Sequence, residues 1–412
     1  MIIPNQKAVI SVREAQLKIA EQVDRLPPEQ VDIENAKGRV LAEELQSDRD
    51  LPPFNRSTFD GIALSYSAVS RGQREFQITG IGYAGSPKTT LADEKACVEI
   101  MTGAPVPDRA SCVVKIEDIK ISNGVATLNY DIEISDGFGI HPAGSDCRAG
   151  ETLLEPGCRL SAKELSIAAS IGKSQLRVSR RPRISIVTTG DELVEISADP
   201  MPHQIRRSND LALQVALESA GYPDLSRHHL LDDPQQTESV VSTLLETSDV
   251  LILAGGVSKG KKDFLPGALA KAGVQKVFQW VRQRPGKPMW FGVIESHGKK
   301  TLVFALPGNP VSCFTCLHRY VLPALAIQSG QSPEPPLFAK LKQPFTFSPP
   351  LTLFLPVSTN CDETGQLWAD PLPFNTSGDY LSVARTQGFI ELSPSESNFE
   401  KGSTHPFVPW SQ

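Results

Sequence analysis

The distribution of apolar residues predicts an α/β region in the second half of the chain. Three short runs there are almost continuously apolar: ISIVT (184–188), DVLILA (249–254) and LVFAL (302–306). Such runs are typical of strands in a parallel sheet whose two faces are both covered. Helical patterns lie between them at 209–220 and 236–247. Because strands and helices alternate, we expect a three-layer α/β domain over about 181–330.

The remaining regions are dominated by short strands and turns. Near the start, Ser11 and Glu14 fit a capping box and predict a helix that begins at this point. Between about 54 and 140, short apolar runs alternate with Gly, Pro and Asn, which predicts a β-rich domain. A helical pattern follows at 161–171, and the sequence SPEPP after Gly330 is interpreted as a linker. The residues beyond this linker predict a small β-barrel.

Composition and charge narrow the class of protein. A chain of 412 residues is too long for one hydrophobic core, and its 40% hydrophobic and 21% charged residues are normal for a folded soluble protein. The sequence contains no run of about 20 apolar residues, so we expect no membrane span. The start MIIPNQKAVISV does not resemble a signal peptide, so we expect a cytoplasmic protein without membrane contact. The net charge of −6 argues against nucleic acid as a partner and requires a local group of donors for any anionic substrate.

Cysteine and histidine residues give no sign of a metal site or a disulfide framework. The seven cysteines are odd in number and irregularly spaced. Cys313 and Cys316 form a single C-x-x-C motif, but no second ligand pair stands at a spacing suitable for zinc. We interpret them as thiols near the packed face of a helix. His228 and His229 lie in a predicted strand and are interpreted as structural.

Polar residues follow several predicted strands. Ligands of open α/β sheets bind beyond the carboxyl ends of the strands. Asp191 and Glu192 follow the first α/β strand, where helix capping by Asp191 is the alternative interpretation. After the last of these strands, Asn309 suits an N-cap and Pro310 the first helical position, which predicts a helix whose positive end faces the strand edge. Just upstream, the turn Arg284-Pro285-Gly286-Lys287 carries two cations.

The glycine-rich segment after the strand at 249–254 predicts an anion site. Gly255, Gly260 and Lys261 fit the phosphate-binding pattern G-x-x-x-x-G-K-[ST]. Lys262 stands where that pattern needs a hydroxyl to hold magnesium. We therefore interpret the segment as a cradle of backbone N–H groups for an oxyanion, rather than a kinase-type loop.

Taken together, these strings resemble one family. TGDEL, LDDP, GGVSxGxxD, PGKP and LPGNPVS, in this order, resemble the molybdopterin molybdenumtransferases, a family that includes the C-terminal region of the animal protein gephyrin. The earlier segments NRSTFDG (55–61), MTGAP (101–105) and GSD (144–146) also resemble motifs of this family. The resemblance runs from about residue 10 to 400 and covers nearly the whole chain.

The resemblance implies a multidomain α/β plus β fold in an elongated subunit of four domains. The expected domains are a linker and dimerisation domain (1–50 and 140–180), a β-rich domain (51–139), an α/β molybdopterin-binding domain (181–330) and a C-terminal β-barrel (331–412). Family members are homodimers whose active site lies between the α/β domain of one subunit and the β-rich domain of the other. The implied reaction inserts molybdenum from molybdate into adenylylated molybdopterin and releases AMP.

The resemblance also assigns roles to individual residues. The catalytic acids would be Asp60, Asp146, Asp191, Glu192, Asp232 and Asp263. The last four of these would hold Mg²⁺ or another divalent cation, which neutralises charge at the pyrophosphate. The ligand-binding residues would be Thr102, Gly255, Gly256, Ser258, Arg284, Lys287, Pro307, Gly308 and Asn309. Cationic residues are needed because molybdate and the acids repel each other.

The chain departs from the family pattern at several positions, and two rival functions stay open. Ser145 stands in place of a glutamate, Phe59 in place of a methionine, and Arg206, Arg207 and Arg284 make the local site more basic. One rival is the preceding step, molybdopterin adenylylation, performed by single-domain proteins that resemble the α/β domain. The other is a gephyrin-like scaffold without catalysis. The molybdopterin adenylyltransferase and apo-molybdoenzymes are the expected protein partners, and the sequence does not distinguish molybdate from tungstate.

Overall fold

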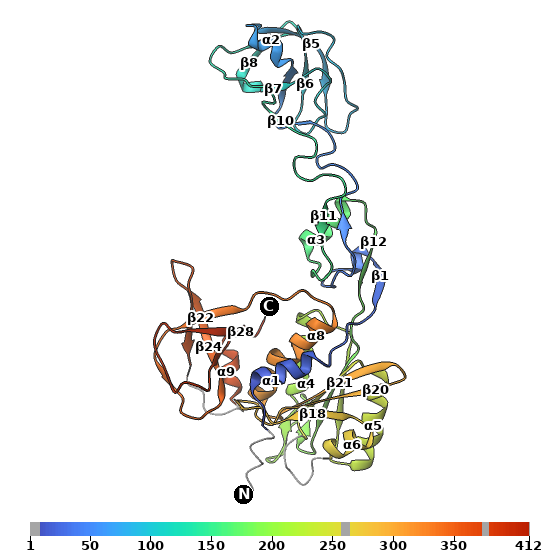
Figure 1. Cartoon of the computed structure of the whole chain (residues 1–412), viewed down its shortest axis with the longest axis vertical. Helices are drawn as coiled ribbons and strands as arrows, with labels where there is room; N and C mark the ends of the chain where they lie inside the picture. Colours follow the sequence, from blue (N-terminus) through green and yellow to red (C-terminus); the bar gives the residue numbers. More distant parts are fainter. Residues whose placement is uncertain (1–8, 257–263, 373–378, 412) are drawn as a thin grey trace. The chain divides into compact units, whose positions relative to one another are not determined.

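The computed structural model describes residues 9–256, 264–372 and 379–411. The chain folds into two compact units (Figure 1). The larger unit comprises Met1–Ala42, Pro156–Ser161 and Gln175–Gln412, and the smaller unit comprises Glu43–Glu155 and Ala162–Ser174. Ser258 and Asp263, two of the predicted site residues, lie outside the described residues.

A six-stranded sheet forms the centre of the larger unit, in the order β16-β13-β17-β21-β20-β18. Its first four strands are parallel, β20 pairs antiparallel with β21, and β18 pairs antiparallel with β20. The strands are β13 (Ile184–Thr189), β16 (Leu225–Leu230), β17 (Val250–Ala254), β18 (Gln275–Gln279), β20 (Trp290–Ser296) and β21 (Lys299–Leu306). The three apolar runs therefore form adjacent parallel strands, as predicted.

Both faces of this sheet are covered, which confirms the three-layer α/β prediction. Along β17, Val250 and Ile252 belong to one buried cluster, and Leu251 and Leu253 belong to another. This alternation arises because successive strand side chains point to opposite faces. The covering helices are α1 (Val12–Ala20), α4 (Asn209–Ser219), α5 (Pro234–Thr247), α6 (Leu265–Lys271), α7 (Pro310–Cys316) and α8 (Leu322–Gln328). A π-helical turn (Leu317–Val321) joins α7 to α8.

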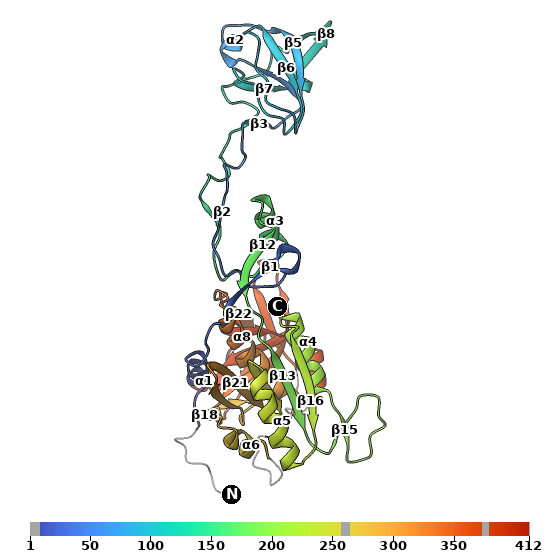
Figure 2. The same cartoon turned by 90° about the vertical axis from the view of Figure 1, so that its right-hand side faces the viewer.

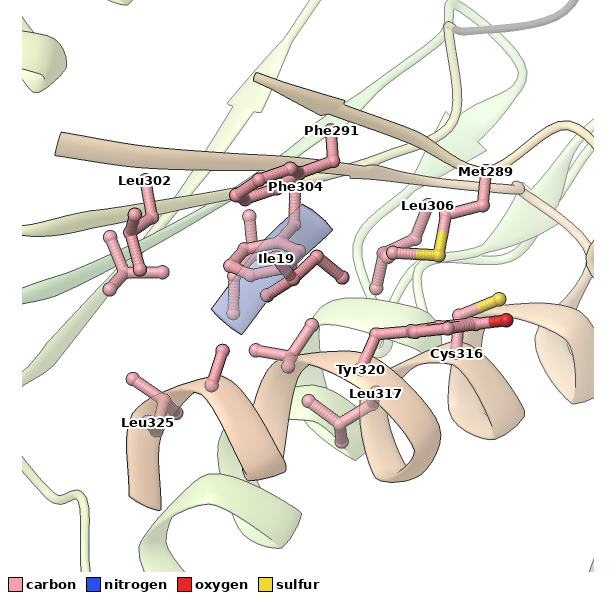
Figure 3. Packing of buried hydrophobic residues seen from close by; sticks show 14 of the residues in the cluster. Ile19, Met289, Phe291, Leu302, Phe304, Leu306, Cys316, Leu317, Tyr320 and Leu325 are labelled. Carbon is pink, nitrogen blue, oxygen red and sulfur yellow. The ribbon is translucent and has the colours of Figure 1, made fainter. Parts of the chain in front are cut away.

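The helical segment Pro310–Gln328 is part of the core. Among the described residues it is long and apolar enough to cross a membrane, but 61% of its apolar window is buried inside the fold. Leu317, Tyr320 and Leu325 belong to the same buried cluster as Phe304 of the sheet and Ile19 of α1 (Figure 3). Its apolar composition is thus explained by packing against the sheet.

Two helix starts agree with the sequence signals. At α1, the Ser11 hydroxyl accepts the backbone N–H of Glu14 and the Glu14 carboxylate accepts that of Ser11, so the predicted capping box is present. Helix α5 begins at Pro234, two residues before the predicted start at 236, because the Asp233 side chain caps it. Cys313 and Cys316 are buried on α7, as interpreted from the sequence.

The C-terminal region forms a closed barrel, as predicted. Its strands are β22 (Leu337–Leu341), β24 (Thr352–Cys361), β25 (Leu367–Pro371), β26 (Gly388–Leu392) and β28 (Thr404–Pro409). Pairing of β24 with β26 closes the sheet. The short strand β19 (Gln283–Arg284) also joins this sheet and runs parallel to β24, although it precedes β20 in the chain. The helix α9 (Tyr380–Ala384) lies between β25 and β26 in the sequence.

The smaller unit is β-rich, as predicted. Its main sheet has six strands in the order β7-β4-β6-β5-β9-β8. These are β4 (Gly61–Leu64), β5 (Glu75–Gly82), β6 (Ala96–Ile100), β7 (Cys112–Lys115), β8 (Ile119–Ser122) and β9 (Val125–Leu128). Two short antiparallel pairs accompany it: β3 (Arg56–Ser57) with β10 (Ile140–His141), and β2 (Leu45–Gln46) with β11 (Thr152–Leu154). The unit also contains α2 (Tyr66–Ser70) and α3 (Ala162–Ser170), whereas β1 (Pro28–Asp32) pairs with β12 (Gln175–Ser179) in the larger unit.

Candidate functional site

Four loops meet at the carboxyl edge of the parallel strands in the larger unit. The strand register aligns Thr189 with Leu230, and Ala254 with Leu306, so these four strands end at one edge. The chain leaves this edge through the segments 190–192, 231–233, 255–256 and 307–309. The sequence therefore located the polar strand ends correctly, and the fold brings them together.

Two cavities lie at this edge. The larger has a volume of about 440 Å³ and is lined by parts of the segments 188–193, 205–209, 254–256 and 307–310. The smaller, of about 120 Å³, lies between the loops that contain Glu192, Asp232 and Gly256. Glu192 lines both cavities. Acidic side chains and glycine backbone thus surround one connected region of the edge.

Asp191 fixes the geometry of the acidic loops. Its carboxylate accepts the backbone N–H of Asp232 at 3.0 Å, which joins the loop after β13 to the loop after β16. The residues that follow Asp191 form the short strand β14 (Leu193–Val194) rather than a helix. The alternative interpretation of Asp191 as a helix cap is therefore wrong. Glycine suits position 190, because its φ of +136° is a backbone conformation that residues with a side chain rarely adopt.

The carboxylates fit a hard divalent cation that is shared with a ligand. Within the part of the chain that the structure describes, no three His, Cys, Asp or Glu side chains are grouped as a complete metal site. Magnesium in phosphate-binding proteins is commonly held by one or two carboxylates together with substrate phosphates. Glu192 and Asp232, which line the same small cavity, suit that arrangement.

The start of α7 carries the third loop of the site. Asn309 occupies the N-cap position and Pro310 begins the helix, as predicted. Asn209, at the start of α4, donates a hydrogen bond from its side-chain amide to the carbonyl of Gly308 at 2.7 Å. The Tyr380 hydroxyl of α9 lies 3.2 Å from the Ser208 hydroxyl. Sequence reasoning missed Asn209 and Tyr380 as site residues, because only the fold brings their segments to this loop.

The two extra arginines of the site are balanced by acids. Arg206 and Arg207 lie at the end of the excursion 193–207, which extends away from the sheet (Figure 2). Arg207 donates to both carboxylate oxygens of Glu195, at 2.8 and 2.9 Å. Arg206 donates to the carbonyl of Ala198 at 3.0 Å and lies 3.8 Å from Asp199. Nearby carboxylates therefore offset the positive charge of these two arginines.

The turn after β19 presents two cationic side chains. Arg284 and Lys287 line a third cavity, of about 390 Å³, together with Pro307 and Asn309. Neither cation forms an ion pair with the described residues. Gln283 stabilises the turn, because its side-chain amide donates a hydrogen bond to the carbonyl of Pro285 at 3.1 Å. The arrangement leaves two charged groups available for an anion beside the third loop.

The remaining predicted residues lie in the smaller unit. Asp60 accepts the backbone N–H of Thr102 at 2.7 Å and its hydroxyl at 2.8 Å. These hydrogen bonds lower the pKa of Asp60, so its carboxylate is ionised at neutral pH. Asp146 is paired with His141 at 2.8 Å, a partner that the sequence analysis did not single out. His141 was not recognised because it lies in β10 outside the matched motifs.

The larger unit thus presents an α/β sheet edge with a glycine-lined cavity and acidic loops. Residues 185–327 match the family model described as a probable molybdopterin binding domain. Residues 10–172 match the MoeA N-terminal region (domain I and II), and residues 339–410 match the MoeA C-terminal region (domain IV).

Relatives identify the family. A molybdopterin molybdenumtransferase of Synechocystis is 40% identical over 380 residues, which are 92% of this chain and 94% of the relative. The Bacillus subtilis molybdopterin molybdenumtransferase is 30% identical over 409 residues, or 97% and 94% of the two chains. A molybdopterin biosynthesis protein from Pyrococcus horikosii has a solved structure with a TM-score of 0.79 and 26% identity, covering 98% of this chain and all of that one. The chain belongs to the molybdopterin molybdenumtransferase family, which confirms the resemblance.

Proposed function

We propose that the protein inserts molybdenum from molybdate into adenylylated molybdopterin and releases AMP. The observation that carries this proposal is the meeting of Glu192, Asp232, Gly255 and Asn309 at one sheet edge in a chain of this family. The adenylylation rival is not favoured, because the transferases named above match the chain over nearly its whole length. A scaffold without catalysis does not require acids around a cavity.

The larger carboxyl-edge cavity suits the pterin and its phosphates. Gly255 and Gly256 allow a ligand to approach the backbone closely, since glycine has no side chain. The cations Arg284 and Lys287 line the neighbouring cavity and are suited to molybdate, because an oxyanion offers acceptors to both side chains. Because neither has an acidic partner in the part of the chain that the structure describes, their charge is available to a ligand.

A divalent cation, Mg²⁺ in our proposal, would be held by Asp191, Glu192 and Asp232, with Asp263 added from the sequence motif. When bound, it would supply charge neutralisation at the phosphates. Asp191 orients the Asp232 loop through its hydrogen bond to that backbone. The dithiolene sulfur atoms that receive molybdenum belong to the pterin, so these residues act by position and charge.

We further propose that the protein acts in the cytoplasm as a homodimer. In this arrangement Asp60, Thr102 and Asp146 of one chain serve the site of the other. Support comes from the family resemblance, and the ionised Asp60 carboxylate is suited to a charged role in such a site. The molybdopterin adenylyltransferase and apo-molybdoenzymes are the proposed protein partners, since they supply the substrate and accept the product.

The test is AMP release from adenylylated molybdopterin in the presence of molybdate and Mg²⁺. We expect Asp232→Asn to lower the rate by roughly 100-fold, because it removes a charged group beside the phosphates. Glu246→Gln, on the exposed side of α5, is the matched control and should leave the rate unchanged. If the wild type instead forms adenylylated product from molybdopterin and ATP without molybdate, the adenylylation rival replaces this proposal.

A further inference from the structure

A large cavity of the larger unit lies at the opposite edge of the sheet from the candidate site. It has a volume of about 870 Å³. Arg183, Asp224 and Asp249 line it, and each directly precedes a parallel strand: β13, β16 and β17. Lys299 and Lys300, at the start of β21, complete this edge. We call it the amino-edge cavity, and it shares no lining residue with the carboxyl-edge cavities.

The lining of the amino-edge cavity is strongly cationic in a chain whose net charge is −6. Its cations outnumber its acids by seven to four. The cations are Arg25, Arg39, Arg180, Arg181, Arg183, Lys299 and Lys300. The acids are Asp24, Glu29, Asp224 and Asp249. A local excess of one sign of charge in a concave site attracts ligands of the opposite sign.

Three of the four acids form ion pairs with cations of the cavity. Arg180 donates to both carboxylate oxygens of the buried Asp249, at 2.9 and 3.1 Å, and the backbone N–H of Arg183 donates to the same carboxylate at 2.8 Å. Lys300 pairs with Asp24 at 2.8 Å. Arg39, which is only 7% exposed, pairs with Glu29. These ion pairs connect the segments that line the cavity.

Arg181 has no ion-pair partner among the described residues. Its guanidinium makes no hydrogen bond or ion pair with the described residues, and its Nε atom is buried without an acceptor. Burial and then the nearby Arg39 lower the pKa of Arg181, and Glu29 and Asp224 only partly offset this, so the charged form is less favourable in the fold than in water. Burial also lowers the pKa of Lys299. A partly buried cation without a partner is unfavourable unless an anion offsets its charge.

We propose that the amino-edge cavity binds a polyphosphate-bearing anion of nucleotide size at Arg181. A volume of about 870 Å³ is in the range of small-molecule sites, and planar guanidinium groups match phosphate oxygens in pairs. More than one phosphate is needed, because the excess of cations over acids is three. This site is separate from the transferase site, so the proposal does not depend on the proposed function.

The test uses inorganic tripolyphosphate as the probe, at constant ionic strength, with calorimetry and thermal unfolding of the full chain. Lys287→Ala, at the carboxyl edge, removes a cation from the other anion site. We expect the Arg181-dependent binding of the probe to be the same in wild type and in Lys287→Ala, and Arg181→Gln to bind the probe at the amino-edge cavity at least about tenfold more weakly. Arg181→Lys should recover part of the affinity, because it restores the charge. Lys276→Gln, an exposed cation of β18 outside the cavity, should bind as the wild type does.

Thermal unfolding without the probe gives a second, independent readout. Arg181→Gln should melt at or above the wild-type temperature, because a cation without an ion-pair partner among the described residues is gone, and the probe should raise its Tm less than it raises that of the wild type. Lys299→Gln provides a second variant if Arg181→Gln does not fold, and it should also weaken binding. Equal affinity in wild type and these variants, or loss of binding in Lys287→Ala instead, would overturn the proposal.

Discussion

At the scale of single residues, Gly286 belongs to the cationic turn of the site and packs against the buried Cys316 of the core. Its φ of +86° is in the left-handed region, and a Cβ there would lie 2.6 Å from the Cys316 sulfur. We expect Gly286→Ala to lower the free energy of unfolding by about 2–5 kcal/mol, from backbone strain and overpacking together. Urea denaturation measures this loss. Gly298→Ala is the matched control: its φ is +73° with nothing within 4 Å, so about 1–2 kcal/mol is expected. Equal losses would contradict the packing argument.

The Asp60 carboxylate offers a test of electrostatics at the same scale. Its pKa is lowered first by the backbone N–H of Thr102 and then by the Thr102 hydroxyl. Thr102→Val should therefore raise the pKa of Asp60 but leave it below its ordinary value, whereas Thr102→Ser should preserve it. Because the folded pKa is the lower one, these bonds stabilise the fold at neutral pH, and that contribution is lost as the pH falls through the folded pKa. Carboxyl carbon NMR titration measures the shift. No change in Thr102→Val would exclude the hydroxyl as a cause.

At the scale of elements, two adjacent aspartates have different tasks. Asp233 caps α5 by accepting the backbone N–H of Gln236 at 2.8 Å, while Asp232 faces the small cavity. We expect Asp233→Ala to lower the free energy of unfolding by about 1 kcal/mol with little effect on AMP release per folded molecule. Asp232→Asn should do the reverse. Denaturation and AMP-release assays on both variants separate the roles, and an activity loss in Asp233→Ala as large as that in Asp232→Asn would contradict the division.

Elements with strong local signals were predictable from the sequence, and those set by distant partners were not. Continuous apolar runs located β13, β17 and β21, because a strand buried on both faces has no polar side to interrupt the run. The strand β19 joins the barrel sheet through β24, about 70 residues later, which no local pattern reveals. For the same reason the loops of the site were found from the strand ends, whereas Asn209, Tyr380 and His141 were missed.

At the scale of the whole molecule, cationic side chains are concentrated in two regions of a chain whose net charge is negative. The chain carries a net charge of −6, yet Arg284 and Lys287 at the carboxyl edge, and the cations of the amino-edge cavity, make two local regions that favour anions. At physiological salt, exposed charges beyond about 8 Å are largely screened. A bound anion therefore interacts mainly with these nearby cations, and the net charge of the chain has little influence on it.

The proposed sharing of sites in a homodimer gives the final prediction. Asp60→Ala and Asp232→Ala chains, each inactive alone, are co-expressed with different tags, and mixed dimers are isolated. If Asp60 of one chain serves the site of the other, each mixed dimer has one intact site and about half the wild-type AMP release. Pairing a wild-type chain with an Asp60→Ala/Asp232→Ala chain is the control, and it should be inactive, since both sites then lack one acid. The opposite pattern, with activity only in the control, would mean that each chain completes its own site.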